Sequence, residues 1–164
     1  MSNELLKQKI LRKLEEDSRL DARTLGILLD APEEEIRSIV EECEKDGTIL
    51  SYMAKINWEK TEQKMVRAII ELKTTPQRDR GFGAIAERIA QFPEVKSAYL
   101  MSGGFDLALT VEGETMRDVA IFVAEKLATM DGVTSTATHF VLQTYKEDEI
   151  VFTKETTDKR GNTW

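Results

Sequence analysis

Apolar residues recur at helical spacing in three runs within the first 50 residues. The first predicted helix ends at about Asp17, the second begins after the capping residue Asp21 and ends near Asp30, and the third ends near Gly47. The third starts in Asp30-Ala31-Pro32-Glu33, which has the D-x-x-E spacing of a capping box and a proline near the helix start. Three helices joined by connections of about three to four residues predict a helix-turn-helix unit. The apolar positions that define the runs are Leu6, Ile10, Leu11 and Leu14; Leu25, Leu28 and Leu29; and Ile36, Ile39, Val40 and Cys43.

A different pattern begins after residue 63, where alternating apolar positions are separated by helical runs. The order of elements is β-α-β-β-α-β, which predicts the α+β class and a ferredoxin-like domain with both helices on one face of an antiparallel sheet. Residues 149–152 predict a further short strand at the sheet edge. The predicted elements are strands at 65–73, 95–102, 106–112 and 133–145, and helices at 80–92 and 114–130.

These patterns divide the chain into four parts. Residues 48–57, with the sequence ILSYMAKIN at 49–57, predict an extended segment that leaves the helical domain. The polar residues that follow indicate a hinge, and the last residues have the composition of a loose tail. We therefore expect a helix-turn-helix domain at 1–58, a hinge at 59–63, a ferredoxin-like domain at 64–152 and a tail at 153–164.

The predicted sheet has one face that its two helices do not cover. Alternation in the third and fourth strands places apolar residues on both faces. A large exposed apolar face rarely stays in contact with water, so this pattern predicts oligomerisation through the sheet. The alternating sets are Leu107, Leu109 and Val111 against Ala108 and Thr110, and Thr136, Thr138, Phe140 and Leu142 against Ala137, His139 and Val141.

Composition narrows the class of protein. The 164 residues have a net charge of −7, with 41% hydrophobic and 32% charged residues, so the chain can build a core and has no overall basic character for nucleic-acid binding. The lone cysteine, Cys43, excludes an internal disulfide and fits a reducing compartment. No signal-peptide pattern begins the sequence, and no apolar run approaches about 18 residues. We expect a cytoplasmic protein without membrane association.

No catalytic or metal-binding pattern is present in the sequence. His139 is the only histidine, and Cys43 belongs to an apolar helical stripe, so neither a Cys-His pair nor a histidine metal cluster is expected. Gly81 and Gly83 lack the third glycine of a phosphate-binding loop and fit the start of a helix better. The run Glu33-Glu34-Glu35 is explained by the favourable interaction of carboxylates with the helix dipole at the start of a helix. The sequence therefore predicts a protein that is not an enzyme and has no metal or other cofactor.

The stretch LMSGGFDLAL at 100–109 interrupts two predicted strands with a polar connection. One interpretation is a tight turn in which glycine supplies a positive φ. The other is a site where glycine amides and the carboxylate of Asp106 meet a small polar ligand. The two interpretations are compatible, because a turn can also present its amides.

The region from about Leu5 to Lys146 resembles the Lrp/AsnC family of leucine- and asparagine-responsive regulators, also called feast/famine regulators. Four segments carry the resemblance, in order: ILRKLEEDSRLDARTL, DGTILSYMAKIN, MSGGFDLALTVEG and MDGVTSTATHFVL. The resemblance implies a winged helix-turn-helix joined to a ferredoxin-like effector domain. It implies a transcription regulator that binds double-stranded DNA as a homodimer or a larger ring such as an octamer, and that responds to a small amino acid.

The resemblance also implies an effector site between subunits, in which Gly103, Gly104 and Asp106 face Thr134, Thr136 and Thr138. Glycine amides can receive an α-carboxylate, and Asp106 or the threonine hydroxyls can accept hydrogen bonds from an ammonium group. A second role for Asp106 is open at this stage, since a buried aspartate can instead cap backbone amides nearby.

The predicted recognition helix departs from the family pattern. Its first turn reads Pro32-Glu33-Glu34-Glu35, where the family commonly has serine, threonine and arginine, and residues 1–60 contain ten basic and fourteen acidic side chains. Carboxylates repel phosphate, so we expect weakened DNA binding. The alternative function is an amino-acid-sensing oligomer whose acidic helical domain binds a protein partner. The remaining candidates for DNA contact are Arg23, Arg37, Ser38 and Lys55.

Overall fold

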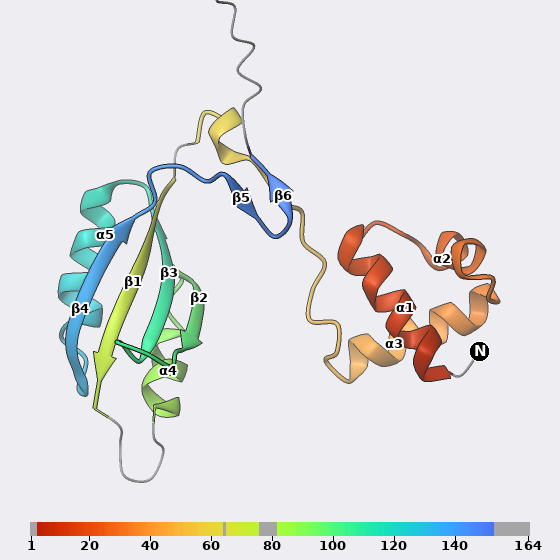
Figure 1. The fold of residues 1–164 in the computed structure, drawn as a ribbon, viewed down its shortest axis with the longest axis horizontal. Coiled ribbons are helices and arrows are strands. Elements are labelled where there is room, and N and C mark those ends of the chain that lie inside the picture. Colours follow the sequence, from red (N-terminus) through yellow and green to blue (C-terminus); the bar gives the residue numbers. More distant parts are fainter. Residues whose placement is uncertain (1–2, 64, 76–81, 153–164) are drawn as a thin grey trace, which may run out of the picture. The chain divides into compact units, whose positions relative to one another are not determined.

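The computed structural model describes residues 3–63, 65–75 and 82–152. The chain divides into two compact units, Met1–Ile56 and Asn57–Trp164 (Figure 1). The predicted tail at 153–164 and the start of the predicted helix at 80–92 lie outside the described residues. Within the described ranges, none of the helices is both long and apolar enough to span a bilayer.

The first unit consists of three helices, as predicted: α1 (Asn3–Glu16), α2 (Ala22–Leu29) and α3 (Glu33–Lys45). Asp21 caps α2, and its carboxylate accepts from the Thr24 N–H at 2.8 Å. The apolar stripes meet in one core, which explains why these short helices are stable together. Its buried members are Leu6, Ile10, Leu14, Leu25, Ile36, Ile39 and Cys43.

The connection between α2 and α3 differs from the predicted capping box. Asp30 has a left-handed backbone (φ 52°) and ends α2, with its N–H donating to the Gly26 carbonyl. Pro32 precedes α3 and makes no side-chain cap, so the prediction that Asp30 and Glu33 form a capping box is wrong. The reason is that Asp30 is used to terminate the preceding helix, where aspartate tolerates the left-handed conformation better than most residues.

Gly26 permits the tight approach of this connection to α2. It is buried, and a Cβ at this position would lie 2.8 Å from the Ala31 carbonyl oxygen. The Ala31 N–H also donates to the Gly26 carbonyl at 3.0 Å. A glycine inside an apolar helix is a recognisable sequence signal for such close packing.

Residues 50–57 are assigned to neither helix nor strand. Tyr52 nevertheless contacts α3, because its hydroxyl donates to Glu44 Oε1 at 2.8 Å. Burial, followed by this hydrogen bond, raises the pKa of Tyr52 to about 12. The second unit opens with a short 3-10 turn, η1 (Trp58–Lys60), in the predicted hinge.

The second unit contains a four-stranded sheet in the order β2-β3-β1-β4, with all neighbouring strands antiparallel. With α4 and α5 packed on one face, this is the ferredoxin-like arrangement (Figure 1). Gly83 begins α4, as expected for a helix entry. The elements are β1 (Val66–Thr74), α4 (Gly83–Ile89), β2 (Val95–Leu100), β3 (Leu107–Gly113), α5 (Met116–Phe122), η2 (Val123–Leu127) and β4 (Val133–Phe140).

Strand register separates the covered face of the sheet from the open one. Ala68, Ile70 and Leu72 of β1 are fully buried beneath the helices, and they lie opposite Val111, Leu109 and Leu107 of β3. Thr136, Thr138 and Phe140 of β4 lie opposite the same β1 residues and share that face. The open face has a mixed composition: Arg67, Ile69, Glu71 and Lys73; Tyr99; Ala108, Thr110 and Glu112; and Ser135, Ala137 and His139.

Three predicted elements differ from the structure by more than a shift of a few residues at their ends. The helix predicted at 114–130 starts at Met116 and changes to a π-helical turn, η2, at Val123. The strand predicted to reach residue 145 ends at Phe140, so Leu142 lies beyond the sheet and is 91% exposed. The short strand predicted at 149–152 is present as β6 (Ile150–Val151), but its predicted place at the sheet edge is wrong, because β6 pairs with β5 (Lys146–Glu147) in a separate hairpin. The chain leaves the four-stranded sheet before it turns back on itself.

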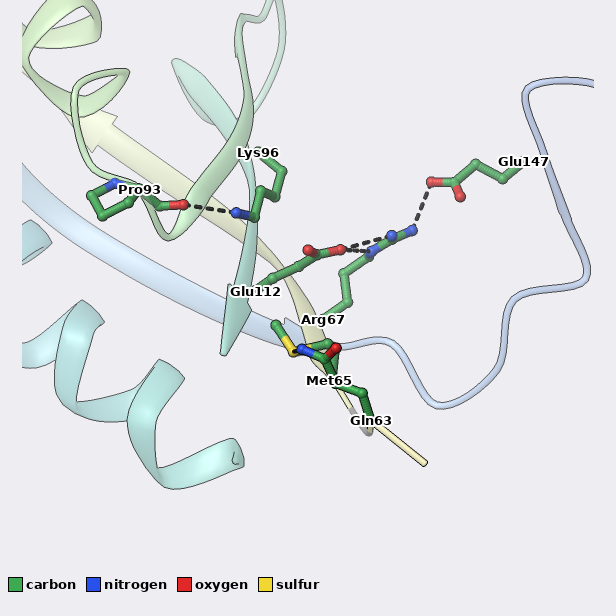
Figure 2. Close-up of polar contacts among 7 residues, drawn as sticks. All are labelled: Gln63, Met65, Arg67, Pro93, Lys96, Glu112 and Glu147. Carbon is green, nitrogen blue, oxygen red and sulfur yellow. Dashed lines mark hydrogen bonds and ion pairs between the residues drawn. The ribbon is translucent and has the colours of Figure 1, made fainter. Parts of the chain in front are cut away.

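Arg67 joins this hairpin to the sheet (Figure 2). Its guanidinium lies 2.7 Å from Glu112 Oε1 on β3 and 2.7 Å from Glu147 Oε1 on β5. Burial opposes the charge of Arg67, but hydrogen bonds to both carboxylates outweigh it and raise the pKa of the guanidinium. The three side chains therefore form one ion-pair cluster across three strands.

Candidate functional site

The connection between β2 and β3 is a six-residue loop, 101–106, that its own backbone closes. The Met101 N–H donates to the Asp106 carbonyl at 2.8 Å. Gly103 has φ 153°, whereas Gly104 is not among the glycines with positive φ, and a Cβ at either position would meet open space. The predicted use of a positive φ in this turn therefore applies to Gly103 and not to Gly104.

Asp106 binds the end of β1 through both its backbone and its side chain. Its N–H donates to the Leu72 carbonyl at 2.9 Å, and its carboxylate Oδ2 accepts from the Thr74 N–H at 2.7 Å. Because β3 begins at Leu107, the carboxylate supplies the acceptor that a further β3 carbonyl would otherwise offer to Thr74. Asp106 is half-buried in this position.

The threonines of β4 lie on the other side of β1. The Thr134 hydroxyl donates to the Lys73 carbonyl at 3.0 Å, at a register irregularity between Lys73 and Thr74. Thr136 is half-buried and Thr138 is exposed at the sheet edge. Within one chain the last residues of β1 thus stand between the loop and the β4 threonines, with Asp106 bonded to β1 on one side and Thr134 on the other.

Thr74 belongs to this site although no pattern in the sequence indicated it. It is 8% exposed, and its hydroxyl has no hydrogen-bond partner among residues 3–63, 65–75 and 82–152. Its N–H is held by Asp106, and the next N–H, of Thr75, donates to the Gly132 carbonyl at 2.7 Å. No local signal identifies this role, because it depends on the register of β1 between two strands distant in sequence.

The candidate DNA-contacting residues lie in the first unit, and all four are exposed. Arg23 is on α2, Arg37 and Ser38 are on α3, and Lys55 is in the segment after α3. The pKa of Asp21 is lowered, mainly by hydrogen bonds from Thr24 and to a smaller extent by the nearby charges of Arg23 and Arg37. The two arginines therefore act on one carboxylate at the start of α2.

Arg37 also binds an acidic residue of its own helix. One guanidinium nitrogen lies 2.7 Å from Glu33 Oε1, an i,i+4 pair on α3. Glu34 and Glu35 are exposed in the same first turn. The N-terminal end of α3 thus presents carboxylates, and Arg37 on the same helix is already paired with one of them.

Cys43 and His139, the other residues considered for catalysis or metal binding, have structural surroundings. Cys43 is fully buried in the first core, and burial raises the pKa of its thiol, which makes the thiolate unfavourable. His139 lies on the open face of the sheet, 3.4 Å from Glu71 Oε1. Within the ranges that the structure describes, no group of three or more histidine, cysteine, aspartate or glutamate residues is placed to hold a metal ion.

Comparison with known proteins decides the family. The sequence model of the Lrp/AsnC ligand-binding domain family matches residues 67–151. The HTH-type transcriptional regulator YugG of Bacillus subtilis is 45% identical over 153 residues, covering 93% of this chain and 92% of that protein. The chain belongs to the Lrp/AsnC family. This Lrp/AsnC protein is accordingly a transcriptional regulator and not an enzyme, and its relatives do not favour the protein-partner alternative.

Solved structures share the fold. A transcriptional regulator of Neisseria meningitidis, crystallised in complex with L-Met, has a TM-score of 0.70 and 24% identity, covering 87% of this chain and 91% of that one. The leucine response regulatory protein LrpA of Mycobacterium tuberculosis has a TM-score of 0.73 and 21% identity, covering 87% and 94%. At these identities the similarity establishes the common architecture of this Lrp/AsnC protein and those regulators.

Proposed function

We propose that this Lrp/AsnC protein binds specific double-stranded DNA through a winged helix-turn-helix and that a small amino acid, bound between subunits, changes its affinity for DNA. The observation that carries the proposal is the 45% identity, over 93% of this chain, to a regulator of the HTH type. In this proposal, residues 1–58 form the DNA-binding domain, residues 59–63 the hinge and residues 64–152 the ligand-binding domain. We also propose that the protein acts in the cytoplasm.

The three-helix unit supports the first part of the proposal. Gly26 allows a close turn between α2 and α3, and the exposed residues of α3 include Arg37 and Ser38. Arg23 on α2 would add a DNA contact, and so would Lys55 in residues 50–57, which would take the place of the wing. The carboxylates at the start of α3 would repel phosphates, so we expect weak binding by one domain and a gain from two domains in a symmetric assembly.

The loop and the β4 threonines support the second part. The open surroundings of Gly103 and Gly104 leave room for a ligand carboxylate beside the backbone amides. Hydroxyls of Thr134, Thr136 or Thr138 from a neighbouring subunit would complete the site and accept from the ammonium group. The L-Met complex of the Neisseria meningitidis regulator makes amino acids the first ligands to test.

The open face of the sheet supports a homodimer, with a larger ring such as an octamer as its extension. Ile69 and Tyr99 are 46% and 59% exposed on this face, beside Ala108 and Ala137. Light scattering of the full chain should give at least twice the mass of 18.6 kDa, and Ile69→Glu should lower it. A monomer at micromolar concentration contradicts this part of the proposal.

The direct test is an electrophoretic shift of DNA from the region upstream of the protein's own gene. The shift should appear at low salt, weaken at higher salt and change when one member of a panel of amino acids is added. A scrambled DNA of equal length is the control for specificity. Equal binding to both DNAs, or no effect of any amino acid, would contradict the corresponding half of the proposal.

A further inference from the structure

We infer that Asp106 is a positioning residue, which fixes the effector loop to the end of β1 through the Thr74 amide and contributes no charge to the ligand. This inference deepens the proposed function and rests on it. The observation behind it is the 2.7 Å hydrogen bond from the Thr74 N–H to Asp106 Oδ2.

The geometry commits Asp106 to the protein itself. Its N–H binds the Leu72 carbonyl, its carbonyl accepts from Met101, and its carboxylate accepts from Thr74. Three polar groups of one residue thus close the loop and attach it to β1. A carboxylate that already caps a backbone amide loses part of its capacity to receive an ammonium group, and moving it would leave the Thr74 N–H without its acceptor.

The attachment reaches both parts of the candidate site. Lys73, next to Thr74, is bound through its carbonyl by the Thr134 hydroxyl on the β4 side. Asp106 binds Thr74 on the β3 side. The two-residue segment Lys73-Thr74 is therefore held from both flanks, and the position of the loop glycines relative to β1 depends on the Asp106 bond.

Substitutions at Asp106 can separate a positioning role, which needs a hydrogen-bond acceptor, from a ligand-binding role, which needs a negative charge. Asparagine keeps an oxygen that can accept from the Thr74 N–H but has no negative charge. Alanine removes both. If Asp106 positions the loop, Asp106→Asn rescues the effector affinity that Asp106→Ala loses. If Asp106 binds the ammonium group by charge, both variants lose affinity.

The test uses the full chain with two measurements, amide hydrogen exchange at Thr74 without ligand and calorimetric titration with the panel of L-amino acids. We expect Asp106→Ala to speed exchange at Thr74 and to weaken effector binding, each by about tenfold or more. Asp106→Asn should stay within about threefold of the unmodified chain in both measurements. Glu114→Gln, at an exposed glutamate beyond the far end of β3, is the matched control.

Each outcome decides a separate point. Weak binding by Asp106→Asn while exchange at Thr74 remains slow would overturn the inference and assign a charge role to Asp106. Unchanged binding by Asp106→Ala would also overturn it. If Asp106→Ala does not fold, the comparison of Asp106→Asn with the unmodified chain still decides between charge and hydrogen bonding. Failure of every amino acid to bind the unmodified chain would overturn the proposed effector response itself.

Discussion

The carboxylate of Glu33 lies 2.7 Å from the guanidinium of Arg37, one turn further along α3. Both side chains are about half exposed, so the pair contributes little to stability. Its effect is on the surface that α3 presents, because it neutralises a cation that would otherwise be available to a phosphate or a base edge. A DNA contact by Arg37 therefore competes with Glu33 for the guanidinium.

Arg37→Ala should weaken DNA binding by roughly 1–3 kcal/mol if the guanidinium reads a base, and the loss should then depend on the DNA sequence. If Arg37 contacts a phosphate, the loss should be nearly equal for all sequences. Fluorescence anisotropy with the upstream DNA and a scrambled DNA separates the two. Arg12→Ala, at an exposed position on α1, is the control; an equal effect of both substitutions would remove the specific role of Arg37.

Glu34→Lys and Glu35→Lys should each tighten non-specific DNA binding, because each replaces a repelling charge in the first turn of α3 by an attractive one. One added phosphate contact should steepen the dependence of log K on log salt by about 0.9. Glu41→Lys changes the net charge equally further along α3 and should have a smaller effect. Identical salt dependence in all three variants would mean that only net charge matters.

Gly26→Ala should destabilise the first unit by about 1–3 kcal/mol, despite the higher helix propensity of alanine. The added Cβ would lie 2.8 Å from the Ala31 carbonyl, so the connection to α3 has to move. Urea unfolding followed by circular dichroism gives the change. Ile27→Ala, at a position of the same helix that is 76% exposed, tests the propensity effect without touching the Asp21 cap. A Gly26→Ala chain as stable as the unmodified one would show that the connection shifts without cost.

Ionisation of Tyr52 should report its contact with α3. Its pKa is raised to about 12 by burial and by the hydrogen bond to Glu44, so this contribution to stability is complete below the unfolded value of about 10 and decreases as pH rises toward 12. Ultraviolet titration of the chain carrying Tyr99→Phe and Tyr145→Phe isolates this tyrosine. Glu44→Gln should lower the midpoint, whereas Glu41→Gln should leave it in place. A midpoint near 10 before any change at Glu44 would contradict the contact.

Arg67→Met should destabilise the second unit by about 1–3 kcal/mol, because Glu112 and Glu147 would lose their cationic partner while partly buried (Figure 2). Urea unfolding measures the loss. Lys96→Met is the control, since the Lys96 ammonium is exposed and binds the Pro93 carbonyl at 2.8 Å. Loss of stability from Lys96→Met alone would contradict the special role of the cluster.

Local patterns predicted the helices and the order of the strands, because hydrophobic periodicity and the cap at Asp21 act over a few residues. The same local reasoning failed at Asp30, where two neighbouring helices require different roles from one residue. It also could not find the bond between Asp106 and Thr74, which are 32 positions apart and meet only through strand register. The loop glycines and the β4 threonines remain predictions as ligand contacts.

Cys43 is the only thiol in the chain and is sealed in the core formed by α1, α2 and α3. A thiol reagent can reach it only in molecules whose first unit has opened. Residues 57–164 contain no cysteine, so their unfolding gives no signal of its own. The rate at which this one sulfur is labelled therefore measures how often the helical unit opens in the intact chain. A lower rate in the presence of DNA or an amino acid would show that the ligand slows this opening.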